Sequence, residues 1–279
     1  MIFLLLAIFS SAMLSIIMRL SDRRVTDNIA MLSVNYLMCV LVAAAYAGFG
    51  NLLPASEGLP ATVLMGCING GLYLGSFALL QFNIRRNGVV LSSTFMKLGL
   101  LVSIIVSVVF FREMPTALQL TGFALAVAAI ILINFKRESG NSGGFKAGLF
   151  LLLLGGGLGD SMAKIFEELG NPALESQFLV YTFAAALILC TALMIAKKQR
   201  PGKWEIIYGL LIGVPNYFSA KFLLAALETV PAVIVYPVCS VATILVVTVT
   251  GVLVFRERLE KRQWAGMGLI LIALALLNI

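Results

Sequence analysis

The tripeptide Phe111-Arg112-Glu113 lies between two apolar runs and recurs, 144 positions later, as Phe255-Arg256-Glu257. Between Val89–Asn134 and Val233–Asn278, thirteen of forty-six aligned pairs are identical, and no gap is needed. Apolar matches are common in so apolar a chain, so the argument rests on the polar and small matches: Gln119 with Gln263, Gly122 with Gly266, and Asn134 with Asn278. The pattern predicts two related halves, residues 1–138 and 145–279, joined by a flexible linker at 139–144.

The composition places both halves in a membrane. Hydrophobic residues make up 61% of the chain and charged residues 12%, against about 45–50% and about 25% in soluble proteins. The chain has no histidine, which removes histidine metal sites and histidine-based nucleophilic triads. GxSxG, HExxH, Walker A and CxxC motifs are also missing from it. We therefore expect no enzyme activity, no catalytic residue, no metal and no cofactor.

The apolar runs predict ten transmembrane helices, since about 20 residues span the hydrocarbon core of a bilayer. The fold class is therefore an all-α integral membrane protein. Short loops between the runs predict that sequential helices are antiparallel neighbours. The predicted helices are Ile2–Met18, Ile29–Ala47, Ala61–Phe82, Val89–Phe110, Leu118–Phe135, Phe145–Phe166, Ala173–Ala196, Trp204–Leu227, Ala232–Val254 and Gln263–Asn278.

Positive charges divide sharply between the two sets of loops. The loops after the odd-numbered helices hold sixteen Lys and Arg residues, among them Arg19 and Lys197, whereas the opposite loops hold only Arg112. Because positively charged loops face the cytoplasm, both termini of this multi-pass chain are predicted to lie outside, on the far side of the cell membrane. The basic loops would meet anionic lipid head groups. This accounts for the net charge of +7 without nucleic acid.

Five helices in each half is an odd number, so the second half would enter the membrane in the opposite sense to the first. We therefore predict two inverted five-helix repeats, related by an axis in the membrane plane. The two Phe-Arg-Glu copies would then lie on opposite faces of the membrane. There a structural clasp between consecutive helices is favoured over substrate contact, because an acid stabilises the positive start of the next helix.

Three lysines lie inside predicted helices, namely Lys97, Lys164 and Lys221. A charge at bilayer depth costs at least about 2.5–3.5 kcal/mol, so each ammonium should face a cavity or a partner; the alternative is snorkelling to the interface. Asp160 precedes Lys164 by four residues on one helix face, so the two can pair. Glycines at 155–157 permit close helix contact or a local break. This helix either lines a substrate pathway or only packs.

Polar residues also interrupt the third and eighth predicted helices at matching places. Tyr73 matches Tyr217 in the repeat, and Asn69 and Asn216 lie beside glycine or proline. In the ninth helix, Tyr236 precedes a proline, which removes a backbone donor and frees a carbonyl. Such interruptions point to a binding site near the membrane midplane. The alternative for each residue is an ordinary interhelical hydrogen bond.

The chain resembles the EamA-type branch of the drug/metabolite transporter superfamily. The resemblance rests on two halves that each end in an apolar-x-Glu hairpin, followed by Gln and then Gly at fixed distances. The resemblance spans essentially the whole chain. It implies an inverted five-plus-five fold and secondary transport, often export, of amino acids, metabolites or drugs. It also implies a cavity lined mainly by helices 1, 3, 4, 6, 8 and 9. Those helices carry the candidate substrate-binding residues Asn69, Tyr73, Lys97, Asp160, Lys164, Asn216, Tyr217, Lys221 and Tyr236.

The chain departs from the superfamily in two ways. Many members keep both termini in the cytoplasm, whereas the charges here place them outside. Cation exporters of the superfamily carry a membrane-embedded glutamate in helix 1, and this chain has no acid there. With its embedded lysines, the sequence favours an anionic or zwitterionic substrate, including an amino-acid-like one.

We expect a secondary transporter that moves a small organic metabolite by alternating access, in the export direction, with a proton or another ion as a candidate coupling ion. The first alternative is a translocator of hydrophobic drugs or lipid-linked substrates, whose cavity would open sideways to lipid. A membrane enzyme acting on lipid head groups would need a cluster of acids, bases or metal ligands. A passive channel would usually assemble a ring of like groups by oligomerisation.

Overall fold

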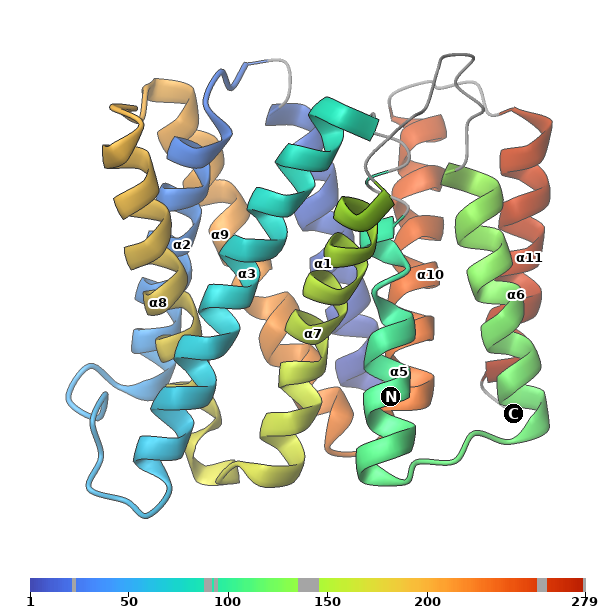
Figure 1. The fold of residues 1–279 in the computed structure, drawn as a ribbon, viewed down its shortest axis with the longest axis horizontal. Helices are drawn as coiled ribbons and strands as arrows, with labels where there is room; N and C mark the ends of the chain where they lie inside the picture. Colours follow the sequence, from blue (N-terminus) through green and yellow to red (C-terminus); the bar gives the residue numbers. More distant parts are fainter. Residues whose placement is uncertain (22–23, 88–91, 93–94, 135–145, 255–259, 278–279) are drawn as a thin grey trace. The chain divides into compact units, whose positions relative to one another are not determined.

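The computed structural model describes residues 1–21, 24–87, 92, 95–134, 146–254 and 260–277 (Figure 1). Over these ranges the regular structure is entirely helical, and seven helices are long and apolar enough to cross a membrane. This confirms the prediction of an all-α, multi-pass membrane protein. The helices are α1 (Ile2–Ser21), α2 (Asn28–Ala47), α3 (Leu59–Asn87), α5 (Leu100–Phe111), α6 (Ala117–Asn134), α7 (Lys146–Leu169), the 3-10 turn η1 (Pro172–Leu174), α8 (Glu175–Ala196), α9 (Lys203–Leu227), α10 (Ala232–Leu253) and α11 (Lys261–Leu277).

The chain forms two compact units that do not coincide with the predicted repeats. Unit 1 comprises residues 1–74 and 165–228, and unit 2 comprises residues 75–164 and 229–279. Each unit therefore contains helices from both predicted halves. The halves at 1–138 and 145–279 stay a prediction about sequence, and the linker at 139–144 lies outside the described residues.

Two helix crossings in unit 1 are built in the same way. On α9, a Cβ at Gly209 would lie 2.7 Å from the Met31 carbonyl oxygen of α2, and one at Gly213 would lie 2.8 Å from that of Asn35. Glycine therefore lets the two backbones touch. On α3, Gly66 and Gly70 meet the carbonyls of α8 in the same manner, at 3.2 Å from Phe178 and 2.5 Å from Thr182.

The spacing of these contacts repeats residue by residue. The two glycines are four positions apart on both α3 and α9, and the carbonyls they meet are four positions apart on both α8 and α2. The packing of α9 on α2 and the packing of α3 on α8 therefore use the same spacing of contacts.

Unit 2 contains a reciprocal crossing between α6 and α11. A Cβ on Gly122 would lie 3.1 Å from the Ala273 carbonyl oxygen, and one on Gly266 would lie 3.5 Å from that of Ala129. Gly122 and Gly266, like Ala129 and Ala273, are matched positions of the sequence repeat. Because early residues of each helix meet late residues of the other, α6 and α11 run antiparallel (Figure 1).

The fourth predicted helix, Val89–Phe110, is interrupted within its described part. Residues 95–97 are helical, Leu98 and Gly99 form a turn, and α5 begins at Leu100. The Gly99 amide donates to the Met96 carbonyl (3.1 Å) and the Leu101 amide to the Leu98 carbonyl (3.0 Å), which are the tighter bonds of a 3-10 turn. The break coincides with the crossing of α7, where a Cβ on Gly99 would lie 2.7 Å from the Gly157 nitrogen.

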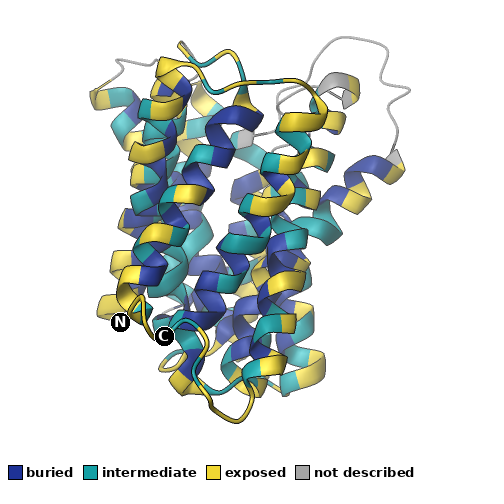
Figure 2. Cartoon of the chain, turned by 90° about the vertical axis from the view of Figure 1, so that its left-hand side faces the viewer, coloured by how far each residue is buried: buried dark blue, intermediate teal, exposed yellow. Residues whose placement is uncertain are grey.

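The prediction that sequential helices are neighbours is wrong for several pairs. α1 packs along α9 rather than α2, and α6 packs along α11 rather than α5. A short loop fixes only the ends of two helices, whereas glycine surfaces such as Gly122 and Gly209 decide which helices come close along their length. Figure 2 shows the result as helices with buried residues on one side and exposed residues on the other.

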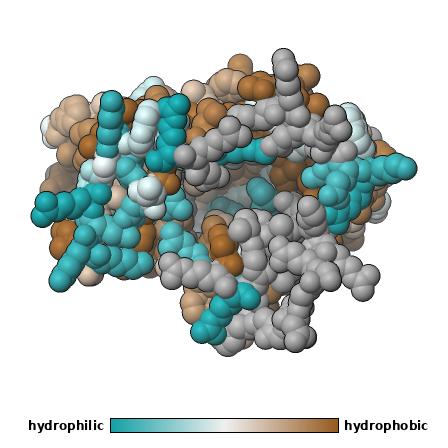
Figure 3. All heavy atoms as spheres, turned by 90° about the horizontal axis from the view of Figure 1, so that it is seen from above, coloured by the Kyte–Doolittle hydropathy of each residue, from teal (hydrophilic) through white to brown (hydrophobic). Residues whose placement is uncertain are grey.

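Basic loops meet at one end of unit 1. The guanidinium of Arg24, in the loop after α1, lies 4.3 Å from the ring centre of Trp204 at the start of α9. Glu205 of α9 accepts hydrogen bonds from the Thr26 amide (2.9 Å) and hydroxyl (3.1 Å). The loops after α1 and α8 therefore share an end, and hydrophilic side chains gather there in Figure 3. This arrangement is the one that the alternation of loop charges predicts within the unit.

Candidate functional site

The nine candidate substrate-binding residues divide between the two units. Unit 1 holds those from α3 and α9, which are Asn69, Tyr73, Asn216, Tyr217 and Lys221. Unit 2 holds those near α5, α7 and α10, which are Lys97, Asp160, Lys164 and Tyr236. Each unit therefore assembles its own polar group, and the two groups differ in chemistry.

Lys97 and Asp160 form a pair of opposite charges in unit 2. Each group lies within electrostatic range of the other. Both residues are exposed. No ion pair joins either residue to a described residue, so their charges face each other without direct contact.

The crossing of α7 over the helix break positions both charges. Lys97 lies two residues before Gly99, and Asp160 lies three residues after Gly157. The Gly157 carbonyl accepts hydrogen bonds from the hydroxyls of Ser103 (3.0 Å) and Ser161 (2.6 Å). Ser103 belongs to α5 and Ser161 to α7, so one carbonyl oxygen accepts a hydrogen bond from each helix. These two bonds hold the backbones in contact. Of the two roles that the sequence allowed for the glycines of α7, the structure shows the close contact, and α7 itself is unbroken.

Tyr236 joins the same group from α10. Its hydroxyl donates to the backbone carbonyl of Asp160 at 2.9 Å. The side chain is 4% exposed, so the ring is packed and only its hydroxyl reaches α7. Tyr236 therefore supports the backbone that carries Asp160, and the structure gives it no contact with the Asp160 carboxylate.

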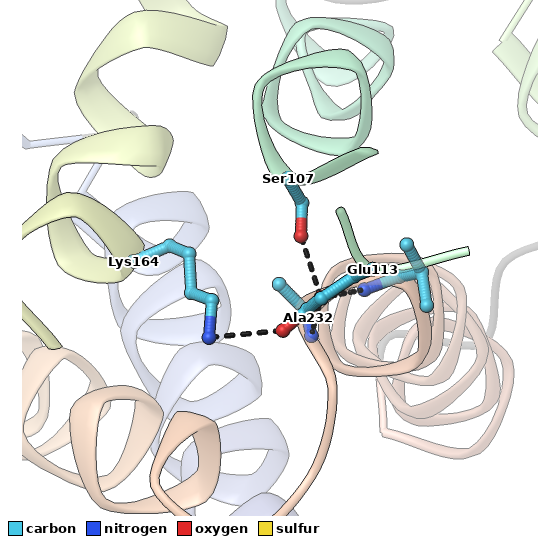
Figure 4. Close-up of polar contacts among 5 residues, drawn as sticks. Ser107, Glu113, Lys164 and Ala232 are labelled. Atoms are coloured by element: carbon cyan, nitrogen blue, oxygen red, sulfur yellow. Dashed lines mark hydrogen bonds and ion pairs between the residues drawn. The ribbon is translucent and has the colours of Figure 1, made fainter. Parts of the chain in front are cut away.

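Lys164 pairs with Glu113 and not with Asp160, so the predicted Asp160–Lys164 pair is wrong. Its ammonium lies 2.9 Å from Glu113 Oε1, with the two side chains 4% and 16% exposed. It also lies 5.9 Å from the centre of the Phe111 ring. Residues four apart share a helix face, but the Lys164 stem points to the hairpin loop, where a carboxylate is already held in place (Figure 4). Snorkelling is excluded for Lys164 by its burial.

Glu113 holds the α5–α6 loop against the start of α10. Its Oε2 accepts hydrogen bonds from the Ser107 hydroxyl (2.5 Å) and from the amides of Ala232 (2.7 Å) and Val233 (3.4 Å). We call this set of contacts, with Lys164, the Glu113 clasp (Figure 4). A carboxylate is favourable at the positive start of a helix. The sequence predicted this role for the next helix, α6, and the structure assigns it to α10 instead.

The charge state of Glu113 follows from these partners. Partial burial acts to raise the pKa of the Glu113 carboxyl. The hydrogen bonds from Ser107 and Lys164, the positive charge of Lys164 and the Ala232 amide outweigh that effect, so the pKa lies below its ordinary value. Glu113 is therefore an anion at neutral pH, and the clasp is a charged one.

The other repeated residues of the hairpin motif serve helix starts and helix contacts. Gln119 Oε1 accepts from the Thr116 amide (3.0 Å), and the Thr116 hydroxyl accepts from the Gln119 amide (3.2 Å), which is a capping box at the start of α6. Gln263 Oε1 accepts from the Glu260 amide (2.8 Å) at the start of α11. Gly122 and Gly266 form the α6–α11 crossing. Phe255, Arg256 and Glu257 lie outside the described residues.

The asparagines of unit 1 make neutral hydrogen bonds between helices. Asn216 Nδ2 of α9 donates to Asn35 Oδ1 of α2 at 3.2 Å. Asn69 Nδ2 of α3 donates to the Thr182 hydroxyl of α8 at 3.4 Å, and its own Oδ1 is buried without a hydrogen-bond partner among the described residues. Both asparagines thus act as interhelical hydrogen bonds at the two glycine crossings, the alternative that the sequence left open.

The tyrosines of unit 1 belong to an aromatic cluster. The rings of Tyr73 and Tyr217 both pack against Phe183, with centroids 6.3 Å away in each case. Tyr217 is fully buried, and its hydroxyl has no hydrogen-bond partner within the described part of the chain. Lys221 lies 3.7 Å from the centre of the Tyr46 ring, a cation–π contact. Lys221 therefore has an aromatic partner within unit 1.

Sequence reasoning missed several residues that these contacts require. Ser107, Asn35 and Thr182 are ordinary polar residues in apolar helices, and their partners are far away in the sequence, so no local pattern marks them. The glycine pairs at 66 and 70 and at 209 and 213 carried a readable signal, because G-x-x-x-G in an apolar segment indicates close helix packing. Across the described residues, no group of three or more acids or cysteines could hold a metal ion.

Comparisons with known proteins identify the second half of the chain. Residues 145–279 match the model of the EamA-like transporter family. An uncharacterized protein of Haemophilus influenzae (strain ATCC 51907 / DSM 11121 / KW20 / Rd) is 23% identical over 276 residues, which cover 95% of this chain and 93% of that protein. A crystal structure of a protein 12% identical in sequence superimposes with a TM-score of 0.77, covering 99% of this chain and 94% of its own. The last likeness concerns the fold alone.

Proposed function

Because residues 145–279 match the model of the EamA-like transporter family, we propose that this multi-pass membrane protein is a secondary transporter of a small organic metabolite. The observation that carries the proposal is the pair of Lys97 and Asp160, two accessible and opposite charges inside the apolar part of unit 2. Charges at that depth are expensive unless they serve a pathway or a partner. Neither charge has an ion-pair partner among the described residues.

The chemistry of the pair favours an anionic or zwitterionic substrate. The Lys97 ammonium would bind a carboxylate or phosphate, and the Asp160 carboxylate would bind an ammonium group. An amino-acid-like solute carries both groups on one small frame and fits best by charge complementarity. A cation without an anionic group would be repelled by Lys97.

The mechanism that we propose is alternating access between two inverted five-helix halves, in the direction of export. The equivalent crossings of α9 on α2 and of α3 on α8 support related halves, and the antiparallel α6–α11 crossing supports an inverted relation. In this proposal the chain lies in the cell membrane with both termini outside. A proton or another ion would supply the driving force.

Proteoliposome flux with a panel of anionic, zwitterionic and cationic metabolites tests this function, with and without a pH gradient. Wild-type flux should saturate with substrate concentration. Lys97→Ala should lower the flux of anionic and zwitterionic substrates by about tenfold or more, since a charge-assisted contact is lost. Lys203→Ala, which removes an exposed lysine at the basic end of unit 1, is the matched control and should leave flux unchanged.

Two results would overturn the proposal. The first is Lys97→Ala protein that transports every anionic and zwitterionic candidate as the wild type does. The second is flux that never saturates, which would indicate a passive channel.

A further inference from the structure

The two helices of the α5–α6 hairpin are joined by five residues yet do not pack along each other. Between them lies a groove of about 470 Å³, which we call the hairpin groove. Its walls are formed by Ile105 and Val109 on α5 and by Leu120 and Phe123 on α6, and Val233 of α10 also lines it. The groove therefore lies within unit 2, beside membrane-spanning helices.

The lining of the hairpin groove is apolar almost throughout. Of its residues, only Gln119 carries a polar side chain, and that side-chain oxygen already accepts from the Thr116 amide at 3.0 Å. Ile105 and Val109 are 58% and 64% exposed. Because these helices lie in a bilayer, the medium that meets the open side of the groove is lipid hydrocarbon.

A cation lies next to lining residues of the groove in the sequence. Arg112 follows α5 directly and precedes Met114 and Pro115, which both line the groove. Its exposed side chain makes no ion pair or hydrogen bond with the residues that the structure describes, and on the sequence it is the one basic residue of its set of loops.

The backbone of Arg112 gives a second, independent indication of a role for its side chain. Its φ of +57° and ψ of +27° lie in the left-handed region, which residues other than glycine, asparagine and aspartate rarely adopt. Glycine would meet the needs of the turn without strain. Strained positions often serve a site, and here the strained residue carries a guanidinium without an ion pair among the described residues, two residues before Met114 of the groove.

We propose that the hairpin groove binds one acyl chain of a membrane phospholipid whose phosphate is held by Arg112. An apolar tail meets the walls, and an anionic head meets the guanidinium, which favours phosphate geometry. From Arg112 to Ile104 the groove descends by about 12 Å along α5, at about 1.5 Å per residue, so the tail points into the hydrocarbon from a head at the interface. This inference needs only that the chain spans a membrane and does not depend on the transport proposal.

Native mass spectrometry of the full chain in a neutral detergent tests the site, with dioleoyl phosphatidylglycerol and dioleoylglycerol as probes. The two lipids share their tails, and only the first carries a phosphate. Wild-type protein should bind phosphatidylglycerol about tenfold or more tightly than dioleoylglycerol. Arg112→Gly should remove that preference while its thermal unfolding temperature stays the same or rises, because glycine relieves the backbone.

Filling the groove should weaken the binding of the lipid tails, which both probes share, rather than the preference for a phosphate. Val109→Trp should weaken binding of both lipids, and Leu120→Trp tests the same wall from α6 if the first variant does not fold. Ile188→Trp is the matched control, because Ile188 is a 67% exposed position on α8 in unit 1 and does not line the groove. Arg200→Gly controls for the loss of one positive charge elsewhere.

The proposal is overturned if the Arg112→Gly and groove-filling variants bind both lipids as the wild type does. It is equally overturned if Ile188→Trp and Arg200→Gly lose as much binding, because the lipid is then held by the general surface. Tight binding of dioleoylglycerol without any phosphate preference would assign the groove to a neutral hydrophobic ligand instead.

Discussion

Units 1 and 2 use the same means of packing and differ in the charges that they hold. Both bring helices into backbone contact through glycine, at Gly209 and Gly66 in unit 1 and at Gly157 and Gly122 in unit 2. The polar groups next to these crossings differ. In unit 1 they are amides and hydroxyls bonded between helices, and in unit 2 they are Lys97, Asp160 and the Glu113–Lys164 pair.

This difference separates the packing of the units from their charges. The glycine spacing recurs in both predicted halves, because close backbone contact depends on spacing alone. The charges do not recur, since Lys97 matches Val241 and Lys221 matches Phe77 in the aligned halves. The units can therefore be compared variant by variant, with a glycine or glutamate in one unit as the control for its counterpart in the other.

The largest effect is expected at the Glu113 clasp. Glu113→Ala should lower the free energy of unfolding by about 3 kcal/mol, because it removes one partner of a buried ion pair. Glu205→Ala in unit 1 removes a carboxylate that also accepts a backbone amide, without an ion pair among the described residues, and should cost about 1.5 kcal/mol. Chemical unfolding followed by circular dichroism measures both. Equal costs would mean that Lys164 adds nothing to the clasp.

Gly157→Ala and Gly209→Ala should each destabilise by about 2 kcal/mol, because both force a Cβ against backbone of another helix. Only Gly157→Ala should also raise the KM for transport, since that crossing positions Lys97 and Asp160. Unfolding curves and flux measurements on the same preparations separate the two effects. A similar rise in KM for Gly209→Ala would show that the crossing acts through overall stability.

Acid should weaken the clasp. The pKa of Glu113 is lowered in the folded protein, so its charge stabilises the fold above the ordinary glutamate value of about 4.3. That contribution is lost as the pH falls through the folded value. The difference in stability between wild type and Glu113→Gln should therefore be largest near neutral pH and shrink below about pH 4. A difference that is constant from pH 7 to pH 3 would contradict a charged clasp.

The smallest effect is expected at the helix starts. Gln119→Ala removes half of a reciprocal capping box and should cost about 0.5–1 kcal/mol, as cap losses usually do. Gln263→Ala removes a single hydrogen bond from the Glu260 amide, so it should lower the free energy of unfolding by no more than Gln119→Ala does. Thermal unfolding in one detergent compares them. A larger loss for Gln263→Ala would indicate a further role for this residue.

The sequence predicted the helices well and their packing poorly. Apolar runs locate nine of the ten helices to within a few residues, because length and hydropathy are local properties. The turn at Leu98 and Gly99 and the packing of α1 on α9 depend on contacts with distant segments, which no local window contains. The same limit applies to the site, since Asp160 at four residues from Lys164 looked like its partner. The actual partner, Glu113, lies 51 positions away.

The clasp and the make-up of the two units also set an order of assembly. Glu113 is synthesised 119 residues before Ala232, whose amide it accepts. Protein synthesis adds about 5–20 residues per second, so the start of α10 is made roughly 6 to 24 seconds after Glu113. Both units also draw helices from the second half of the chain. A ribosome that stops after the first half would therefore leave two unfinished units in the membrane and no completed one.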